Sequence, residues 1–238
     1  MTTAAYAPTG TDGTSLKTTA RLTGLFYLGL GITGMLGFLL VRPSIYDAAD
    51  PAATAANLVS QEGLARIGIA LELGIVLTQA LAAVWFFRLF RAADDFAAGL
   101  IAVFGMVNAI AILMSGAAMW TALSVALDPT MAPGGDAGAI AQLMYELSSN
   151  FWGVGNLFFG LWLIPMGYVV IVSNWMPRVM GWILIGGGVG YVLSGFAAAL
   201  LPDAPGWIVD VLTVPATVGE FWMIGYLLIF GVRSKAAA

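Results

Sequence analysis

The chain has 238 residues, of which 60% are hydrophobic and 9% charged, and its formal net charge at pH 7 is −4. An ordinary soluble domain carries about 25% charged residues, and a soluble fold of this length could not bury so much apolar surface, so the composition predicts an integral membrane protein. Cysteine and histidine are both absent, which excludes disulfides, thiolate zinc, iron–sulfur clusters, imidazole-ligated haem and histidine acid–base catalysis.

The polar leader, residues 1–18, has the composition of a disordered tail rather than of a signal peptide. Six apolar stretches follow, each long enough for the roughly 20 residues that cross a bilayer. They are Arg21–Val41, Leu64–Phe90, Phe96–Val125, Asn150–Val172, Arg178–Leu201 and Trp207–Val232. The predicted fold is an all-α membrane protein with one six-helix transmembrane domain over residues 19–234 and a short tail at 235–238.

The basic residues predict the orientation, because lysine and arginine in short loops are retained in the cytoplasm. An even number of crossings leaves both termini on one side of the membrane. That side collects seven of the nine basic residues, namely Lys17, Arg21, Arg88, Arg91, Arg178, Arg233 and Lys235. Arg42 and Arg66 fall on the other, outer side. We therefore expect both termini to be cytoplasmic.

Two outer loops carry signals for short interfacial helices. Asp50 followed by Pro51 is a typical helix start, an N-cap acid before proline at the first helical position, and it predicts a short helix over residues 52–60. Before the fourth crossing, the apolar residues in 140–147 recur at i, i+3, i+4 and i+7. This pattern predicts a second helix in the interface, before the chain turns inward.

Many of the 30 glycines cluster in the first and fifth crossings. Small residues at helical spacing let membrane helices approach closely, and Gly186, Gly190 and Ser194 form one such face. A phosphate-binding glycine loop would instead need a strand before it and a helix start after it. We therefore interpret the glycines as packing contacts.

Two glutamates, Glu72 and Glu220, lie deep inside apolar stretches. A carboxyl group within hydrocarbon is costly and is a functional-site hypothesis by default. At 100° per residue, other polar residues extend the faces of both glutamates, and two further crossings have polar faces of their own. The candidates for ligand binding or proton exchange are Glu72, Gln79, Asn108, Glu146, Asn150, Asn156, Thr213, Thr217 and Glu220, with Asp210 on the stripe of the last helix. We expect them to share one interior cavity that opens outward.

The two glutamates differ in their neighbours. Arg66 could pair with Glu72 or with Glu62, whereas no basic residue is near Glu220 in sequence. Because loss of water disfavours the charged form, we expect Glu220 to be neutral at pH 7. Its hydrogen-bond partner should be Thr217 or a group on another helix. The alternative is that both are packing contacts, which contribute about 0.6 kcal/mol each in membrane bundles.

Several short motifs carry a family resemblance. They are Ala20-Arg21-Leu22-x-Gly24, Ala52-Ala53-Thr54-Ala55-Ala56-Asn57, Glu62-Gly63-Leu64-Ala65-Arg66-Ile67-Gly68, Pro177-Arg178-x-x-Gly181 and Gly219-Glu220. Together they make the chain similar to a bacterial membrane family, domain of unknown function 4386. The resemblance implies six helices and a bacterial inner-membrane location, and it implies no activity.

Three classes of function remain open. A small-molecule or lipid-binding protein or transporter, with a small lipophilic or cationic ligand, accounts for the buried carboxyl groups. A structural or accessory subunit accounts for the glycine-rich faces. An intramembrane enzyme is the weakest, because no histidine, cysteine or serine–lysine pair is available in the bundle, so we expect neither an enzyme nor a cofactor. The expected partners are membrane lipids and a second copy or another membrane protein, not nucleic acid.

Overall fold

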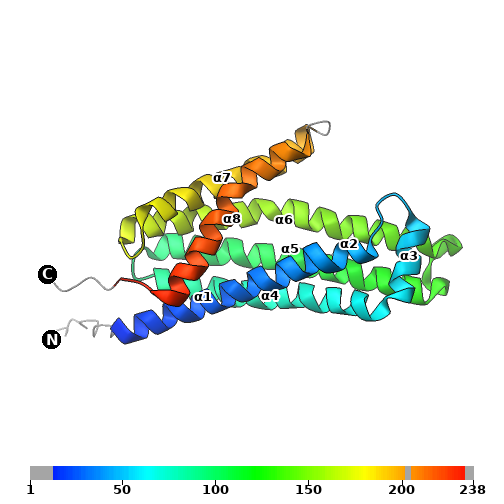
Figure 1. Cartoon of the computed structure of the whole chain (residues 1–238), viewed down its shortest axis with the longest axis horizontal. Helices are drawn as coiled ribbons and strands as arrows, with labels where there is room; N and C mark the ends of the chain where they lie inside the picture. The colour runs from blue at the N-terminus through cyan, green and yellow to red at the C-terminus, as the bar shows by residue number, and fades with distance from the viewer. Residues whose placement is uncertain (1–12, 202–204, 234–238) are drawn as a thin grey trace, which may run out of the picture.

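The computed structural model describes residues 13–201 and 205–233, which are almost entirely helical. Figure 1 shows the α-helices in chain order. Their bounds are α1 Gly13–Met35, α2 Arg42–Ile45, α3 Pro51–Ser60, α4 Glu62–Phe90, α5 Asp95–Leu127, α6 Ala137–Ser173, α7 Arg178–Leu200 and α8 Gly206–Ile229. A π-helical segment, Leu36–Val41, joins α1 to α2 without a break.

Six of the helical runs are long and apolar enough to cross a membrane. They are Ser15–Ile45, Glu62–Phe90, Asp95–Leu127, Ala137–Ser173, Arg178–Leu200 and Val211–Ile229. The predicted all-helical class is confirmed, as are six long apolar helices that are candidate membrane spans, and the chain is a multi-pass membrane protein.

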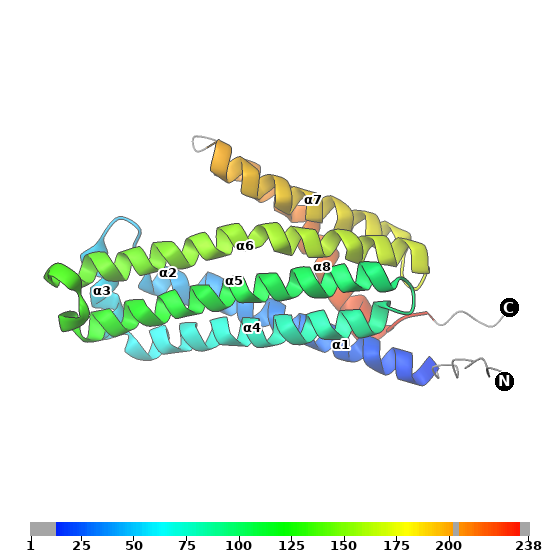
Figure 2. The ribbon, with the colours of Figure 1, turned by 180° about the vertical axis from the view of Figure 1, so that it is seen from behind.

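The helices form a closed ring in the order α1, α4, α5, α6, α7 and α8, because α8 returns to pack on α1. The start of α1 and the end of α8 lie together at what we call the terminal end of the bundle (Figure 1). There the backbone N–H of Arg233 donates to the carbonyl of Trp175, at 3.1 Å, and Gly231 faces Lys17. The opposite, distal end carries α3, and the α7–α8 hairpin diverges from α6 in the direction of that end (Figure 2).

The predicted short helix after Asp50 is confirmed as α3. The Asp50 carboxylate accepts a hydrogen bond from the backbone N–H of Ala53 at 3.0 Å and so caps the helix. The prediction of a second, separate interfacial helix is wrong, because residues 140–147 belong to the first turns of α6. No glycine or proline interrupts the chain between them and residue 150, so the 37-residue helix continues over about 55 Å. At the other end, residues 13–18 of the predicted leader are already helical, and residues 1–12 lie outside the described part.

The glycines of α7, the fifth predicted crossing, pack closely against α6 and α8, which confirms their predicted packing role there. A Cβ atom at Gly160 would lie 2.6 Å from the carbonyl oxygen of Gly188, and one at Gly190 would lie 1.9 Å from that of Leu212. Neither position can hold a side chain unless a helix backbone moves. Gly186, on the predicted small-residue face, has nothing within 4 Å of its Cβ position.

The apolar core is divided into two clusters, and the division falls at Glu72. On α4, Ile69 belongs to the distal cluster and Ile75 to the cluster nearer the terminal end. On α5, Met119 and Ile112 are divided in the same way. A polar layer therefore crosses the bundle between two apolar regions.

Candidate functional site

A buried ion pair between Arg42 and Glu72 forms the centre of the polar layer. Arg42 Nη2 lies 3.2 Å from Glu72 Oε1, and the two side chains are only 9% and 6% exposed. The sequence placed Arg42 in an outer loop and offered Arg66 as the partner. In the structure Arg66 pairs with Glu62, 2.7 Å away and one helical turn earlier on the exposed face of α4. Of the two predicted partners of Arg66, Glu62 is therefore confirmed and Glu72 is wrong.

Serine hydroxyls complete the surroundings of Arg42. Its Nη2 donates to Ser148 Oγ at 2.6 Å and its Nη1 donates to Ser149 Oγ at 3.0 Å. Ser115 on α5 lies 2.8 Å from Ser148, oxygen to oxygen. These contacts matter because a buried charge is tolerated only when it is paired and hydrogen-bonded. The layer thus ties the first helical run to α4, α5 and α6.

The π-helical segment explains how Arg42 comes to face the interior. Pro43 has no backbone N–H and its ring clashes with the carbonyl four residues earlier, so a regular helix cannot continue through it unchanged. The chain widens instead, and the N–H of Arg42 donates to the carbonyl of Gly37, five residues back. This wider turn changes the angular position of every residue after it relative to a regular helix.

Trp152 on α6 connects this layer to a second polar site. Its indole Nε1 donates to Glu72 Oε1 at 3.1 Å. Its ring packs edge to face with Phe38, at 4.8 Å between centroids, and Arg42 lies 5.0 Å from the centroid of the same Phe38 ring. Trp152 also lines the cavity described below.

The second site is centred on Tyr27 and Glu220, which are 193 residues apart in sequence. The Tyr27 hydroxyl on α1 donates to Glu220 Oε1 on α8. Tyr27 is 2% exposed, and its ring is held edge to face against Phe86 and Trp162. The predicted partner on another helix is thus found, whereas no hydrogen bond joins Thr217 to Glu220 among the residues described.

Glu220 lines a cavity of about 240 Å³ between α1, α4, α5, α6, α7 and α8. The floor is formed by buried residues, among them Tyr27, Ile75 and Asn108. The exposed lining residues Met35 and Phe221 lie on α1 and α8, 41% and 49% exposed. The mouth therefore lies at the side of the bundle between α1 and α8, which differs from the expected opening toward the outer surface.

Only three of the predicted candidates line this cavity, namely Asn108, Thr217 and Glu220. Glu72 does not line it, so the two glutamates do not share one cavity as expected. Gln79 is fully buried on α4, and neither of its amide atoms has a hydrogen-bond partner within the described residues. Thr213 is half-buried on α8 outside the lining, and the side chain of Asp210 lies outside the described part.

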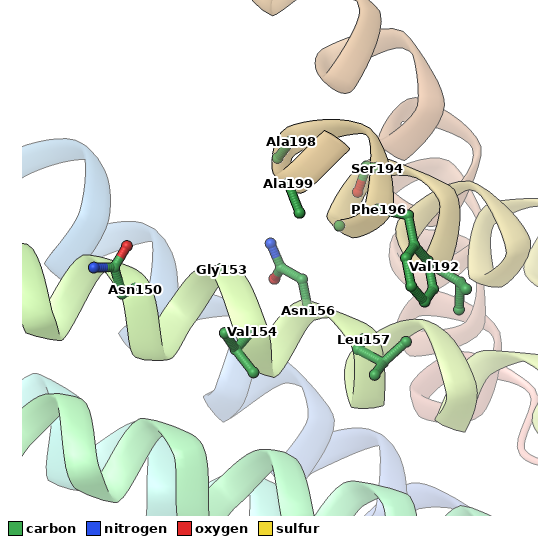
Figure 3. A pocket seen from close by; sticks show the side chains of 11 residues that line it. Asn150, Gly153, Val154, Asn156, Leu157, Val192, Ser194, Phe196, Ala198 and Ala199 are labelled. Carbon is green, nitrogen blue, oxygen red and sulfur yellow. The ribbon is translucent and has the colours of Figure 1, made fainter. Parts of the chain in front are cut away.

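The remaining candidates lie elsewhere on α6. Asn150 and Asn156 line a separate pocket of about 420 Å³ between α6 and the distal half of α7. Figure 3 shows Asn156 extending from α6 toward the segment of α7 that carries Ala198 and Ala199. This pocket lacks charged residues among those described.

Glu146 is exposed near the distal end, where it accepts a hydrogen bond from the Tyr46 hydroxyl. Burial and the bond to Glu146 raise the pKa of Tyr46 to about 12. The phenol therefore stays protonated at neutral pH and can act as the donor. This contact fastens the loop after α2 to α6 and lies apart from the Glu220 cavity.

Sequence reasoning missed the two residues that pair with the glutamates, Arg42 and Tyr27. A tyrosine in mid-crossing, far from the interfacial positions that this residue favours, was the available signal for Tyr27. Adjacent hydroxyls at Ser148 and Ser149 were the signal for the layer around Arg42. Among residues 13–201 and 205–233, no group of three or more acidic residues is placed to hold a metal ion.

The fold and the buried polar sites define a multi-pass helical membrane protein. The family described as Domain of unknown function (DUF4386) matches residues 22–231, nearly the whole chain. The chain belongs to this family. No curated protein and no solved structure matches it.

Proposed function

We propose that the protein binds a small lipophilic molecule or a lipid in the cavity lined by Glu220, as a binding protein or as a transporter. The observation that carries this proposal is the Glu220 carboxyl group, which lies within a mostly apolar cavity of about 240 Å³ that opens at the side of the bundle. Ligand sites are typically apolar hollows with a few convergent polar groups. Here those groups are Glu220, Tyr27, Asn108 and Thr217.

A structural or accessory subunit is the second candidate, and the glycine-rich faces were its main support. The closest glycine contacts are now accounted for inside the chain, since Gly160, Gly188 and Gly190 bring α6, α7 and α8 together. They therefore leave less reason to invoke a partner helix. An intramembrane enzyme stays the weakest candidate, because neither histidine nor cysteine is present.

The binding proposal is tested by native mass spectrometry of the gently solubilised protein. We expect a copurifying lipophilic species on the wild type and its loss in Glu220→Gln, which keeps the shape of the side chain but cannot carry a negative charge. Glu146→Gln is the matched control, because Glu146 lies outside the cavity. The same spectra report the oligomeric state. A species retained equally in Glu220→Gln, or a wild type that carries none, would count against the site.

We also propose a bacterial inner-membrane location with both termini in the cytoplasm. The distribution of basic residues supports this orientation, as does the meeting of the start of α1 with the end of α8 at one end of the bundle. The distal end, with α3, would then face outward.

The orientation can be measured with single cysteines, because the chain has no native cysteine. Ala92 lies in the exposed α4–α5 turn at the terminal end, and Ala49 in the exposed loop before α3. In intact cells, a membrane-impermeant maleimide should label Ala49→Cys and spare Ala92→Cys until the membrane is permeabilised. The reverse pattern would invert the topology.

A further inference from the structure

We propose that the occupant of the Glu220 cavity is a single-chain amphiphile with a cationic ammonium head, which enters from the bilayer between α1 and α8. This inference rests on the proposed function and names its ligand class.

The charge of the head follows from the surroundings of Glu220. Among residues 13–201 and 205–233, no lysine or arginine forms an ion pair with Glu220. Its described polar contact is the neutral Tyr27 hydroxyl. Glu220 is half-buried in a mostly apolar cavity, so its charged form needs a counter-charge there, and an ammonium group that enters the cavity can supply it. Glu72, by contrast, already has the Arg42 guanidinium.

Aromatic rings in the same cavity suit an ammonium group. Phe159 and Tyr191 line it and pack edge to face with their centroids 5.2 Å apart, and Tyr27 and Trp152 line it as well. Cations bind to the faces of such rings, and choline-like groups are recognised in this way. An acid combined with aromatic rings favours an ammonium head over a neutral alcohol.

The same lining argues against a phospholipid head. A zwitterionic phosphate head would bring a negative charge beside Glu220, and no lysine or arginine is among the described residues that line the cavity. Phosphate recognition in proteins relies on such cations. The ligand chemistry is therefore an alkylammonium without a phosphate.

The size of the cavity and the position of its mouth indicate where the apolar tail of the ligand lies. At about 240 Å³, it is smaller than the roughly 300–1,000 Å³ of sites that enclose a drug-sized ligand. It can take the head and the first carbons, and the rest of the chain must continue past Met35 and Phe221 at the mouth. Both side chains are exposed on membrane-crossing helices, so the tail would remain among the lipid chains.

Decyltrimethylammonium is the probe, with decanol and decyl sulfate as neutral and anionic chains of equal length. Binding to the wild-type protein is measured by native mass spectrometry titration. We expect at least tenfold tighter binding of decyltrimethylammonium than of either control, and loss of this preference in Glu220→Gln. Glu146→Gln should keep it. A phosphocholine with the same chain tests the phospholipid alternative and should bind no better than decanol.

A second variant keeps Glu220 intact and closes the cavity instead. Gly34 lines the cavity on α1, and nothing lies within 4 Å of its Cβ position. Gly34→Leu should therefore fold normally, occupy the entrance and weaken decyltrimethylammonium binding at least tenfold. Unchanged binding in this variant would place the probe elsewhere and overturn the proposal.

The pH dependence separates charge pairing from apolar binding. The trimethylammonium charge does not titrate, and the titratable groups that face Glu220 are the phenols of Tyr27 on α1 and Tyr191 on α7. A proton and the cation compete for the carboxylate, so affinity should rise with pH by up to about tenfold per unit while Glu220 titrates. In Glu220→Gln the affinity should not change with pH.

The two proposals can fail separately. Suppose that a neutral species copurifies with the wild type and is lost from Glu220→Gln, but that the wild type shows no preference for decyltrimethylammonium. The ammonium inference is then overturned and the binding function stands. If no species copurifies and none of the probes distinguishes wild type from Glu220→Gln, both are overturned.

Discussion

Replacement of Arg42 by alanine is expected to destabilise the folded protein by about 3–5 kcal/mol, because removal of one partner of a buried ion pair leaves the other charge unpaired. Glu72 is 6% exposed, and its second oxygen, Oε2, already lacks a hydrogen-bond partner among the described residues. Ser148 and Ser149 would lose their donor in the same variant. The contacts between the first helical run and α6 should therefore weaken together.

The measurement is the midpoint of SDS-induced unfolding in mixed micelles, followed by circular dichroism. Arg66→Ala is the matched control, since Arg66 forms an exposed pair with Glu62 that should contribute about 0–1 kcal/mol. The double variant Arg42→Met with Glu72→Leu removes both charges and should be more stable than Arg42→Ala alone. If Arg42→Ala shifts the midpoint no more than Arg66→Ala does, the buried pair does not stabilise the fold.

Gly190→Ala is expected to destabilise the α7–α8 hairpin by about 1–3 kcal/mol, the usual range for overpacking. The added methyl would lie 1.9 Å from the carbonyl oxygen of Leu212. That oxygen belongs to a helix backbone, so α8 as a whole would have to move. Because α8 carries Glu220, we also expect the contact with Tyr27 and the binding of decyltrimethylammonium to weaken.

Gly186→Ala is the matched control for this substitution, one turn earlier on the same helix. Nothing lies within 4 Å of its Cβ position, and alanine has a better helix propensity than glycine by about 1 kcal/mol. It should therefore be neutral or slightly stabilising in the same SDS titration. Equal effects at the two positions would mean that α7 and α8 are not held together by this close approach.

The six crossings were predictable because they depend on local properties of the chain. A bilayer requires about 20 consecutive apolar residues, and each crossing contains such a run. The N-cap at Asp50 could be predicted from the sequence for the same reason, since an N-cap residue acts within one turn of its helix. The prediction of a separate interfacial helix over residues 140–147 was wrong, because apolar residues at helical spacing indicate a helix but do not indicate where it ends.

The site was predictable only in part. Glu72 and Glu220 stand out because a carboxyl group in an apolar run is costly wherever the helix packs. Their partners do not stand out in the same way. Arg42 lies 30 residues before Glu72 and reaches it only through the π-helical segment, and Tyr27 is 193 residues from Glu220.

The sequence by itself determined the membrane class, the six long apolar helices and the two acids that lie within them, since each follows from composition or from the burial of single residues. Only the tertiary structure decided that the acids belong to different sites, one paired with Arg42 and the other facing a lateral cavity. The physical reason is that pairing across helices depends on the order and rotation of the helices around the ring. Many small contacts set that arrangement, including the glycine crossings of α6, α7 and α8 and the wide turn before Pro43.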